Sequence, residues 1–501
     1  MAMLFHSTRG KNVNVTAKQA IRKGIADDGG LFVTDSLGEK TVDVANLPGK
    51  SYQQIAKEVL GILLDDFSAE ELDECINSAY GSNFSDSKIT PVREVGDDYV
   101  LELFHGPTSA FKDIALQILP EFMARAGSEN SKKACERIMI LTATSGDTGK
   151  AALDGFAGTE GTGITVFYPE GKVSEVQRMQ MVAQQGDNVA VCAVRGNFDD
   201  AQSSVKEIFA DKTLADELEK SAETVLSSAN SINVGRLVPQ VVYYFAAYSQ
   251  LLEKQIINVG DEVQFCVPTG NFGDILAGYY AKRMGLPVSK LIVASDKNNV
   301  LFDFFKTGVY DRNRPFYTTT SPSMDILISS NLERMLYYFS DGDSALISSL
   351  MNDLKTTGRY EVPGEIMDKI RQLFECGWAD EEQVANAIAD CRDENSYVLD
   401  PHTACAYHVL SHSQADPMIP RIMLSTASPY KFPRTVLQAL GEECDGSDFE
   451  CMDRLEKISG VPAVRALREL ENAKVRFADA IDVKDMPQYV LEAAKRMANR
   501  E

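Results

Sequence analysis

The feature of this 501-residue chain that most restricts its fold is a repeated unit in which a short apolar run leads through a small-residue loop into a helical pattern. RIMILTAT precedes SGDTG and KAALDGFA, ITVFYPEG precedes SEVQRMQMVAQQ, and VQFCVPTG precedes NFGD and ILAGYYAKRMG. Apolar runs of this length, alternating with helices, are typical of parallel strands that are buried on both faces. The sequence therefore predicts an α/β protein with parallel sheets flanked by helices.

The first 90 residues show a different pattern. TAKQAIRKGI and SYQQIAKEVLGILL space their apolar residues as helices do, and SAEELDECI has the form of a capped helix with Glu in its first turn. We therefore predict an N-terminal helical domain over residues 1–90 and a main α/β region over residues 91–501. Within that region we expect a smaller α/β subdomain at roughly 130–235, and the rest forms the larger one.

Composition and charge narrow the class of partner. The net charge is −23 and the isoelectric point is about 4.8, which argues against nucleic acid and anionic membranes as partners. No run approaches 18 apolar residues, and the first residues resemble neither a signal peptide nor a transit peptide. The nine cysteines form no CxxC pair, as expected for reduced thiols. We predict a cytoplasmic protein, a monomer or homodimer, that acts on a small molecule.

Lys112 occupies an unusual position in HGPTSAFKD, after an expected strand at Tyr99–Phe104 and at the start of an apolar helix. If Thr108 or Ser109 caps that helix, the positive helix end and partial burial both lower the pKa of Lys112. A neutral amine is what Schiff-base chemistry requires. Taken alone, this stretch favours an ordinary surface lysine beside Asp113, so the decision depends on the rest of the chain.

Three loops follow expected strands, at the sheet edge where α/β proteins bind ligands. In GNFGD two glycines allow close backbone approach to an anion at a helix start, although a plain strand–helix turn fits equally well. In SGDTG the hydroxyls and N–H groups suit a carboxylate, and a helix N-cap explains them equally well. STASPYKFP offers hydroxyls that ST turns also explain. The candidate residues are Gly270, Asn271, Phe272, Gly273 and Asp274, then Ser145, Gly146, Asp147 and Thr148, and finally Thr426.

The histidines suggest a metal site that the spacing does not support. His408 and His412 are four residues apart and can share a helix face, with His402 nearby. No Glu lies between them as in HExxH, and no carboxylate or cysteine stands at a suitable spacing. We predict no metal.

The three sets of residues are more informative together than apart. A lysine suited to a Schiff base, a phosphate loop and a carboxylate loop form the set that an amino-acid enzyme using pyridoxal phosphate requires. The cofactor presents an aldehyde, a phosphate and a ring nitrogen, and each needs a protein partner.

The chain also resembles a known family. HGPTSAFKD, TATSGDTGKAAL, SANSINVGRL and PTGNFGDILAGYYAKRMGLP resemble, in that order, the threonine synthases of the long form found in bacteria and fungi. VTAKQAIRKGIADDGGLFV and STASPYKFP fit as well, so the resemblance spans nearly the whole chain. SGDTG, with Asp at its third position, is more similar to threonine synthases than to the SGNTG of cysteine synthase relatives.

The resemblance implies the fold of the tryptophan-synthase-β class of pyridoxal phosphate enzymes (fold type II), with an extra N-terminal domain before a catalytic region at 91–501. It implies that Lys112 binds the cofactor covalently and serves as general base, and that Thr426 bonds the pyridine nitrogen. The cofactor phosphate would be held by Gly270, Asn271, Phe272, Gly273 and Asp274. The substrate would be bound by Ser145, Gly146, Asp147 and Thr148 and, at its phosphate, by Ser231, Asn233 and Arg236.

The reaction implied is the conversion of O-phospho-L-homoserine and water into L-threonine and phosphate. Three alternatives stay open. One is a related phospho-lyase that releases a keto acid, ammonia and phosphate, and the second is a dehydratase or sulfhydrylase of the same fold, which SGDTG disfavours. The third is a non-catalytic protein that only binds the cofactor. For Arg236 a surface ion pair is the alternative role.

Overall fold

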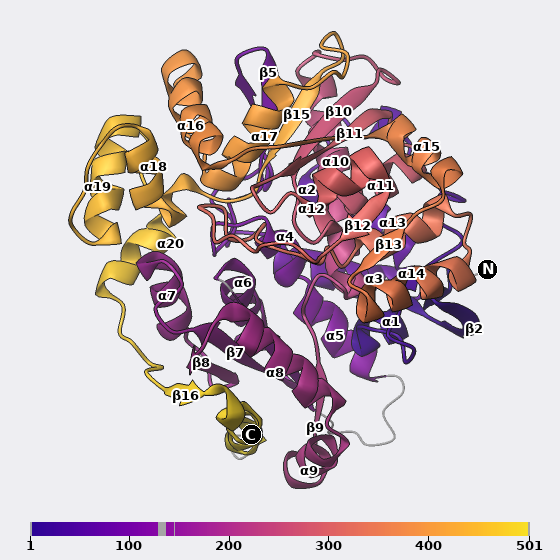
Figure 1. Ribbon diagram of the computed structural model, residues 1–501, viewed down its shortest axis with the longest axis vertical. Helices are drawn as coiled ribbons and strands as arrows, with labels where there is room; N and C mark the ends of the chain where they lie inside the picture. The colour runs from indigo at the N-terminus through magenta and orange to yellow at the C-terminus, as the bar shows by residue number, and fades with distance from the viewer. Residues whose placement is uncertain (1–2, 129–136, 145, 499–501) are drawn as a thin grey trace.

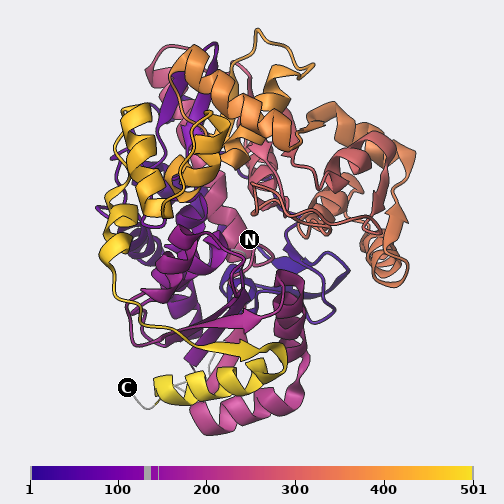
Figure 2. The same ribbon diagram turned by 60° about the vertical axis from the view of Figure 1, so that its left-hand side comes forward.

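Two parallel sheets form the framework of the computed structural model, which describes residues 3–128, 137–144 and 146–498. The larger sheet has the strand order β14-β11-β10-β15-β5-β4, and the smaller has the order β16-β8-β7-β6-β9. Figures 1 and 2 place the larger sheet in the upper part of the molecule and the smaller sheet in the lower part. The predicted α/β fold with parallel sheets and flanking helices is confirmed.

The larger sheet is parallel except at one edge. Its strand β10 is buried along its whole length, and at the edge β4 pairs antiparallel with β5. The strands are β4 (Val92–Val95), β5 (Asp98–Glu102), β10 (Val263–Pro268), β11 (Val288–Ser295), β14 (Phe374–Trp378) and β15 (Arg421–Ser425). Because β5 and β15 are parallel neighbours that end together, the loops that follow them also meet.

Those two loops are tied to each other by backbone hydrogen bonds. The N–H of Phe111 donates to the carbonyl of Thr426 at 2.8 Å, and the N–H of Ser428 donates to the carbonyl of Ser109 at 3.1 Å. The loop containing the candidate lysine and the hydroxyl-rich loop, more than 300 residues apart in sequence, therefore form one rigid edge of the site.

The smaller sheet combines four strands from one segment of the chain with a fifth from near the C-terminus. It contains β6 (Arg137–Ala143), β7 (Thr162–Pro169), β8 (Val189–Arg195) and β9 (Thr224–Ser227), all within the segment expected for the smaller subdomain. Its fifth strand, β16 (Ala480–Asp482), pairs parallel with β8. Helix α21 (Met486–Ala498) then packs its apolar side chains against the same sheet. The pairing of the C-terminal segment with this sheet was not predicted.

The N-terminal unit is not purely helical, which corrects the expectation for it. The predicted helices are α1 (Ala17–Lys23), α2 (Tyr52–Leu63) and α3 (Ala69–Ala79), and each begins with a capping box. Beside them β1 (Phe5–Ser7), β2 (Gly10–Val15) and β3 (Phe32–Val33) form a small antiparallel sheet. Strands this short carry almost no periodic signal, because alternation needs several residues to be visible.

One helix, α10 (Val234–Glu253), is buried along almost its whole length. Helices α2, α4 (Lys112–Leu116), α5 (Leu119–Ser128) and α11 (Gly273–Arg283) pack against it. The other helices of this part of the chain are α6 (Asp147–Phe156), α7 (Glu175–Val182), α8 (Phe198–Ala210) and α9 (Lys212–Ala222).

The helices of the remaining part of the chain lie around the larger sheet and toward the C-terminus (Figure 1). They are α12 (Val300–Thr307), α13 (Leu332–Phe339), α14 (Ser344–Thr356), α15 (Gly364–Leu373), α16 (Glu381–Asn395), α17 (Pro401–Ser411), α18 (Pro433–Ala439), α19 (Asp448–Ser459) and α20 (Arg465–Arg468). A two-stranded ribbon pairs β12 (Val309–Asp311) with β13 (Arg359–Glu361). In the described part of the chain no helix combines the length and apolar character that a membrane span requires.

One glycine allows α4 and α6 to approach closely. A Cβ atom at Gly155 in α6 would lie 1.9 Å from the carbonyl oxygen of Leu116 at the end of α4. Helix α4 also contains Lys112, so this contact helps to set the position of the lysine relative to α6.

Gly155→Ala should destabilise the protein by about 1–3 kcal/mol, because the methyl group would collide with backbone that cannot move independently. The measurement is the unfolding midpoint in urea or on heating. Gly61→Ala in α2 is the matched control, since a Cβ there meets nothing within 4 Å. It should leave stability unchanged or raise it by up to about 1 kcal/mol. Equal stability of Gly155→Ala and the parent would contradict the close approach.

Candidate active site

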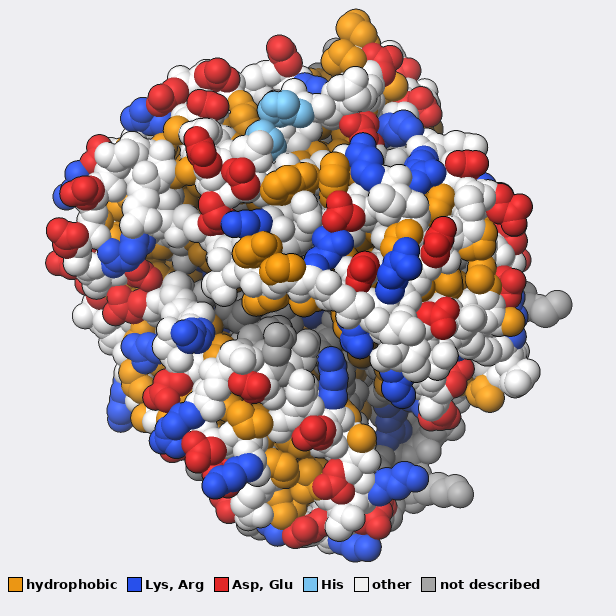
Figure 3. All heavy atoms as spheres, in the orientation of Figure 1, with side chains coloured by type: hydrophobic (Ala, Val, Ile, Leu, Met, Phe, Trp, Pro, Cys, Tyr) orange, Lys and Arg blue, Asp and Glu red, His pale blue; other side chains and the backbone are white. Residues whose placement is uncertain are grey.

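A cavity of about 500 Å³ lies at the carboxyl ends of strands from both sheets. Its walls come from the loops after β6, β10 and β15, from the SANSIN segment, and from an irregular segment over 312–330. Figure 3 shows this face hollowed between the upper and lower parts of the molecule. Of the sequence-predicted residues, those that line it are Lys112, Thr148, Ser231, Arg236, Gly270, Asn271, Phe272, Gly273, Asp274 and Thr426.

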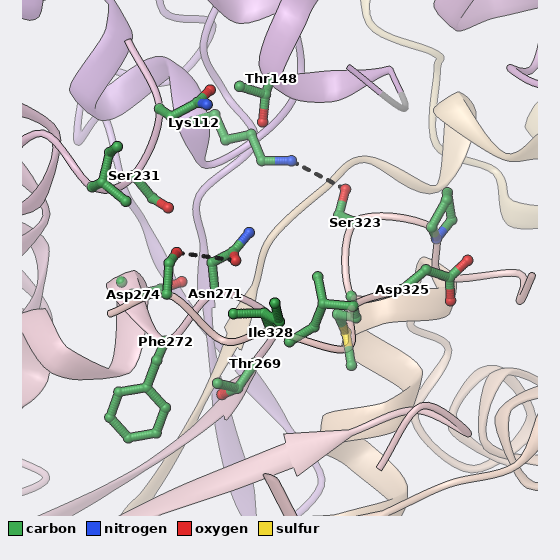
Figure 4. Close-up of a pocket in the computed structure, with 18 of the residues that line it drawn as sticks. Lys112, Thr148, Ser231, Thr269, Asn271, Phe272, Asp274, Ser323, Asp325 and Ile328 are labelled. Carbon is green, nitrogen blue, oxygen red and sulfur yellow. Dashed lines mark hydrogen bonds between the residues drawn. The ribbon is translucent and has the colours of Figure 1, made fainter. Parts of the chain in front are cut away.

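Lys112 is buried and points into this cavity. Its Nζ donates a hydrogen bond to Ser323 Oγ at 3.1 Å and lies 3.8 Å from Asp147 Oδ2 (Figure 4). Burial is the main cause that lowers the pKa of Lys112 to about 8, and nearby Arg236 and Lys431 contribute to the same shift. The alternative of a surface lysine is therefore wrong.

The helix of Lys112 starts differently from the expectation. Helix α4 begins at Lys112 itself, and no side chain caps it. Thr108 instead donates both its N–H and its hydroxyl to the carboxyl group of Asp113, at 2.9 and 2.5 Å. Ser109 adopts a left-handed backbone conformation, with φ of 58°. The predicted cap is wrong, because the two polar residues brace the turn before the helix.

The SGDTG segment brings a carboxylate into the site. Ser145 lies outside the described residues, Gly146 precedes α6, and the side chain of Thr148 points toward the cavity. Asp147 Oδ1 lies 2.6 Å from Lys431 Nζ and accepts from Gln177, and Asp147 Oδ2 accepts from Ser323. Asp147 is thus surrounded by donors from the protein itself.

Asp147 is held ionised by its neighbours. Burial alone would raise the pKa of Asp147, but the positive charges of Lys431 and Lys112 outweigh it and hold the pKa well below its usual range. Lys431 is completely buried and also donates to the carbonyl of Thr108 at 3.0 Å. Lys431 was not among the predicted site residues. The only signal was a lysine within the hydroxyl-rich STASPYKFP.

The GNFGD loop presents backbone N–H groups to the cavity. Phe272 has φ of 62°, which turns the chain into α11. Within the described part of the chain, the N–H groups of Asn271, Phe272 and Gly273 have no protein acceptor. N–H groups left unpaired at a helix start suit an anion.

The side chains of this loop anchor it. Phe272 packs against the rings of Phe305 and Phe374. Asp274 Oδ1 accepts hydrogen bonds from the hydroxyls of Tyr243 and Tyr244 on α10. Burial raises the pKa of Asp274 to about 7. Its carboxyl group therefore joins the loop to α10, and the N–H groups remain for an anion.

The residues of SANSINVGR (228–236) fall into two groups, one that lines the cavity and one that supports the fold. Ser231 and Arg236 line the cavity, whereas Asn233 is outside its lining. Asn233 caps α10, and its side-chain amide donates to the carbonyls of Ile21 and Ser228. The amide predicted to contact substrate thus joins the N-terminal unit to α10 instead.

Arg236 is a buried cation beside the cavity. Its Nη1 donates to the carbonyl of Ala229 at 3.0 Å, and its Nε has no hydrogen-bond partner in the described part of the chain. Burial lowers the pKa of Arg236 to about 10. No described carboxylate pairs with it, so a surface ion pair does not account for this residue.

Thr426 and His402 also line the cavity. The hydroxyl of Thr426 makes no hydrogen bond to any described residue, and so it is available to a ligand. His402 accepts from the N–H of Ser323 at 3.2 Å and contacts Asp400 at 2.8 Å. The rings of His408 and His412 contact each other at the C-terminal end of α17, tilted by 35°. No described group of three His, Cys, Asp or Glu side chains could hold a metal.

Three family profiles match the chain, in the order of its segments. Residues 4–80 match the threonine synthase N terminus, residues 94–420 match pyridoxal-phosphate dependent enzymes, and residues 403–481 match the threonine synthase C-terminal region.

Relatives and solved structures agree with these profiles. The chain is 36% identical to threonine synthase of Eremothecium gossypii, covering 98% of each chain, and 38% identical to threonine synthase of Pseudomonas aeruginosa, covering 87% of this chain and 90% of that one. The crystal structure of PLP-bound threonine synthase from Brucella melitensis superimposes with a TM-score of 0.87 at 36% identity, covering 99% of this chain and 100% of that one.

Human threonine synthase-like 1 is 42% identical over 433 residues, and the match covers 84% of this chain but only 58% of that protein. Because three segment profiles and full-length relatives agree, the chain belongs to the threonine synthase family of pyridoxal-phosphate dependent enzymes.

Proposed function

We propose that the protein is a threonine synthase, which uses pyridoxal phosphate to convert O-phospho-L-homoserine and water into L-threonine and phosphate. The observation that carries this proposal is the buried amine of Lys112, which faces the cavity. The same cavity is lined by the GNFGD loop, whose N–H groups have no described acceptor, and by Arg236, whose guanidinium has no described carboxylate partner. Family membership supports the same reaction.

The residues present fit the cofactor. The N–H groups of Asn271, Phe272 and Gly273 would hold its phosphate, and the hydroxyl of Thr426 would bond its ring nitrogen. When bound there, the cofactor would supply an electron-withdrawing group for the substrate carbon atoms. A neutral hydroxyl at position 426, unlike a carboxylate, does not favour protonation of the ring nitrogen.

Lys112 does the proton chemistry. A pKa of about 8 means that a useful fraction of the amine is neutral near pH 7–8 and can take the proton from the substrate Cα. Loss of a proton from Cβ would let phosphate leave from Cγ. The same amine can then return a proton to Cγ, and water adds its oxygen at Cβ and releases a proton. Burial of the lysine keeps bulk water away from these transfers.

Arg236 is our candidate for binding the substrate phosphate. Its guanidinium is buried, charged and without a carboxylate partner among the described residues, and Ser231 lines the same cavity. A buried cation without a counter-ion is strongly stabilised when an anionic ligand binds beside it. We no longer assign this role to Asn233, because its amide caps α10.

A phospho-lyase that yields 2-oxobutyrate, ammonia and phosphate is the second candidate. The observation in its favour is that the buried amine of Lys112 and the anion-binding N–H groups would serve the loss of phosphate equally well, whichever product follows. The deciding experiment supplies phosphohomoserine and quantifies threonine, 2-oxobutyrate and phosphate in one assay. Threonine as main product supports our proposal, and keto acid supports the lyase. No product at all would contradict both.

Lys112→Ala should abolish product formation and prevent covalent capture of the cofactor. Borohydride should fix pyridoxal phosphate on Lys112 of the parent protein, because the amine is the one group in the lining that combines burial with a pKa of about 8. Peptide mapping by mass spectrometry locates the modified residue. Fixation on a different lysine would contradict the assignment.

Arg236→Lys should lower kcat/KM for phosphohomoserine by about 1.5–3 kcal/mol, roughly 10- to 150-fold, the range for a hydrogen bond to a charged group. A lysine keeps the charge but loses the planar fork that can bond two phosphate oxygens. Binding of homoserine, which lacks the phosphate, is the control and should hardly change. Equal weakening for both ligands would show that Arg236 supports the fold or the cofactor.

A further inference from the structure

The hydroxyl of Ser323 lies between the amine of Lys112 and the carboxylate of Asp147. Lys112 Nζ donates to Ser323 Oγ at 3.1 Å, and Ser323 Oγ donates to Asp147 Oδ2 at 3.2 Å. In Figure 4 the side chains of Lys112 and Ser323 point toward each other across the cavity. Ser323 belongs to the irregular segment between β12 and α13, in which the sequence shows no motif.

The direction of these bonds follows from the number of hydrogens. A serine hydroxyl has one hydrogen, and an ionised carboxylate can only accept. The hydrogen of Ser323 therefore goes to Asp147, and the lone pairs of Ser323 face Lys112. Ser323 accepts an N–H of the lysine and does not compete for the lone pair of its nitrogen. That lone pair is what a general base uses.

Asp147 orients the serine and does not receive the proton. Lys431, at 2.6 Å, and Lys112 keep the pKa of Asp147 well below its usual range in spite of burial. A proton passed from Lys112 through Ser323 to Asp147 would end on a far weaker base than the lysine amine. The proton therefore stays with Lys112.

The backbone of Ser323 is held in place by a hydrogen bond to His402 on α17. Its N–H donates to His402 Nε2, so the hydrogen of a neutral His402 lies on Nδ1, which faces Asp400 at 2.8 Å. His402 and Asp400 are both buried. On its other side, the carbonyl oxygen of Ser323 would lie 3.0 Å from a Cβ at Gly270. Ser323 is thus held between α17 and the GNFGD loop.

We propose that Ser323 is a positioning residue for the reactive lysine, and that its hydroxyl, oriented by Asp147, holds the free amine of Lys112 with the nitrogen lone pair available. This inference rests on the proposed function, because it assigns a task to Lys112 as base. It also gives a physical reason for Asp at the third position of SGDTG. An asparagine there could donate to Ser323 Oγ, which would turn the serine hydrogen toward the lysine lone pair.

The test compares Ser323→Ala and Ser323→Thr with Thr318→Ala, a control in the same segment whose side chain is exposed. Two quantities are measured on the full chain freed of cofactor. One is the rate at which added pyridoxal phosphate becomes linked to Lys112, followed by absorbance. The other is the affinity for 4-deoxypyridoxine 5′-phosphate, which has no aldehyde. Turnover of phosphohomoserine is measured on the loaded protein.

Ser323→Ala should slow both linkage and kcat by roughly 10- to 100-fold, the cost of a small misplacement of a reacting group. Affinity for the deoxy analogue should be unchanged, since the phosphate loop is intact. Ser323→Thr restores the hydroxyl and should recover both rates, and Thr318→Ala should match the parent. Asp147→Asn, which leaves Ser323 in place, should also slow linkage.

Linkage and turnover rates equal to those of the parent in Ser323→Ala would overturn the inference. A loss of affinity for the deoxy analogue as large as the loss of rate would also overturn it, because it would indicate a purely structural role. Parental linkage in Asp147→Asn would overturn the assigned direction of the hydrogen bond. If Ser323→Ala does not fold, Ser323→Cys carries the same expectation, because a thiol is a poor acceptor. If the parent makes no product from phosphohomoserine but Ser323→Ala still slows linkage, the proposed function fails and the role of Ser323 stands.

Discussion

The buried carboxylate of Asp147 is the interaction on which the rest of the site depends. Taking such a charge out of water costs several kcal/mol unless partners compensate for it. Here Lys431 and Lys112 supply the compensation, and Gln177 and Ser323 supply hydrogen bonds. These partners come from four segments far apart in the chain. One ion therefore sets the relative positions of α4, α6, α7 and the loops after β12 and β15.

The cavity has an electrostatic character opposite to that of the whole protein. The chain carries a net charge of −23, and acidic and basic side chains are mixed over the face shown in Figure 3. Burial raises the pKa of two carboxyl groups that line the cavity, those of Asp274 and Asp325, to about 7, so that each is only partly ionised near neutral pH. The cations that line it are Lys112, Lys206, Arg236 and Arg312. Attraction for anionic ligands is therefore local and acts through short contacts.

The N-terminal unit is part of this arrangement. Glu333 on α13 accepts from Thr8 and Arg9 of the first hairpin. The next residue, Arg334, is completely buried and donates to the carbonyls of Phe32 and Ile232 and to the side chain of Asn331. Asn331 in turn donates to the carbonyl of Asn271 in the GNFGD loop. A chain of hydrogen bonds thus connects β3, the SANSIN segment and the anion loop, so distortion of the N-terminal sheet would reach the site.

The sequence by itself determined the α/β fold and the family, and it marked Lys112 and the GNFGD loop as candidates, because these features are written in local patterns. Apolar runs define parallel strands, and Gly-rich loops that follow such strands gather at one sheet edge. The pairing of β16 with β8, the cap formed by Asn233, and the contacts of Lys431, Ser323 and His402 were decided only by the tertiary structure. Each of these depends on a partner that is distant in sequence. Whether a lysine is a surface charge or a buried counter-ion is decided by what lies within about 4 Å of its amine, and no local pattern records that distance.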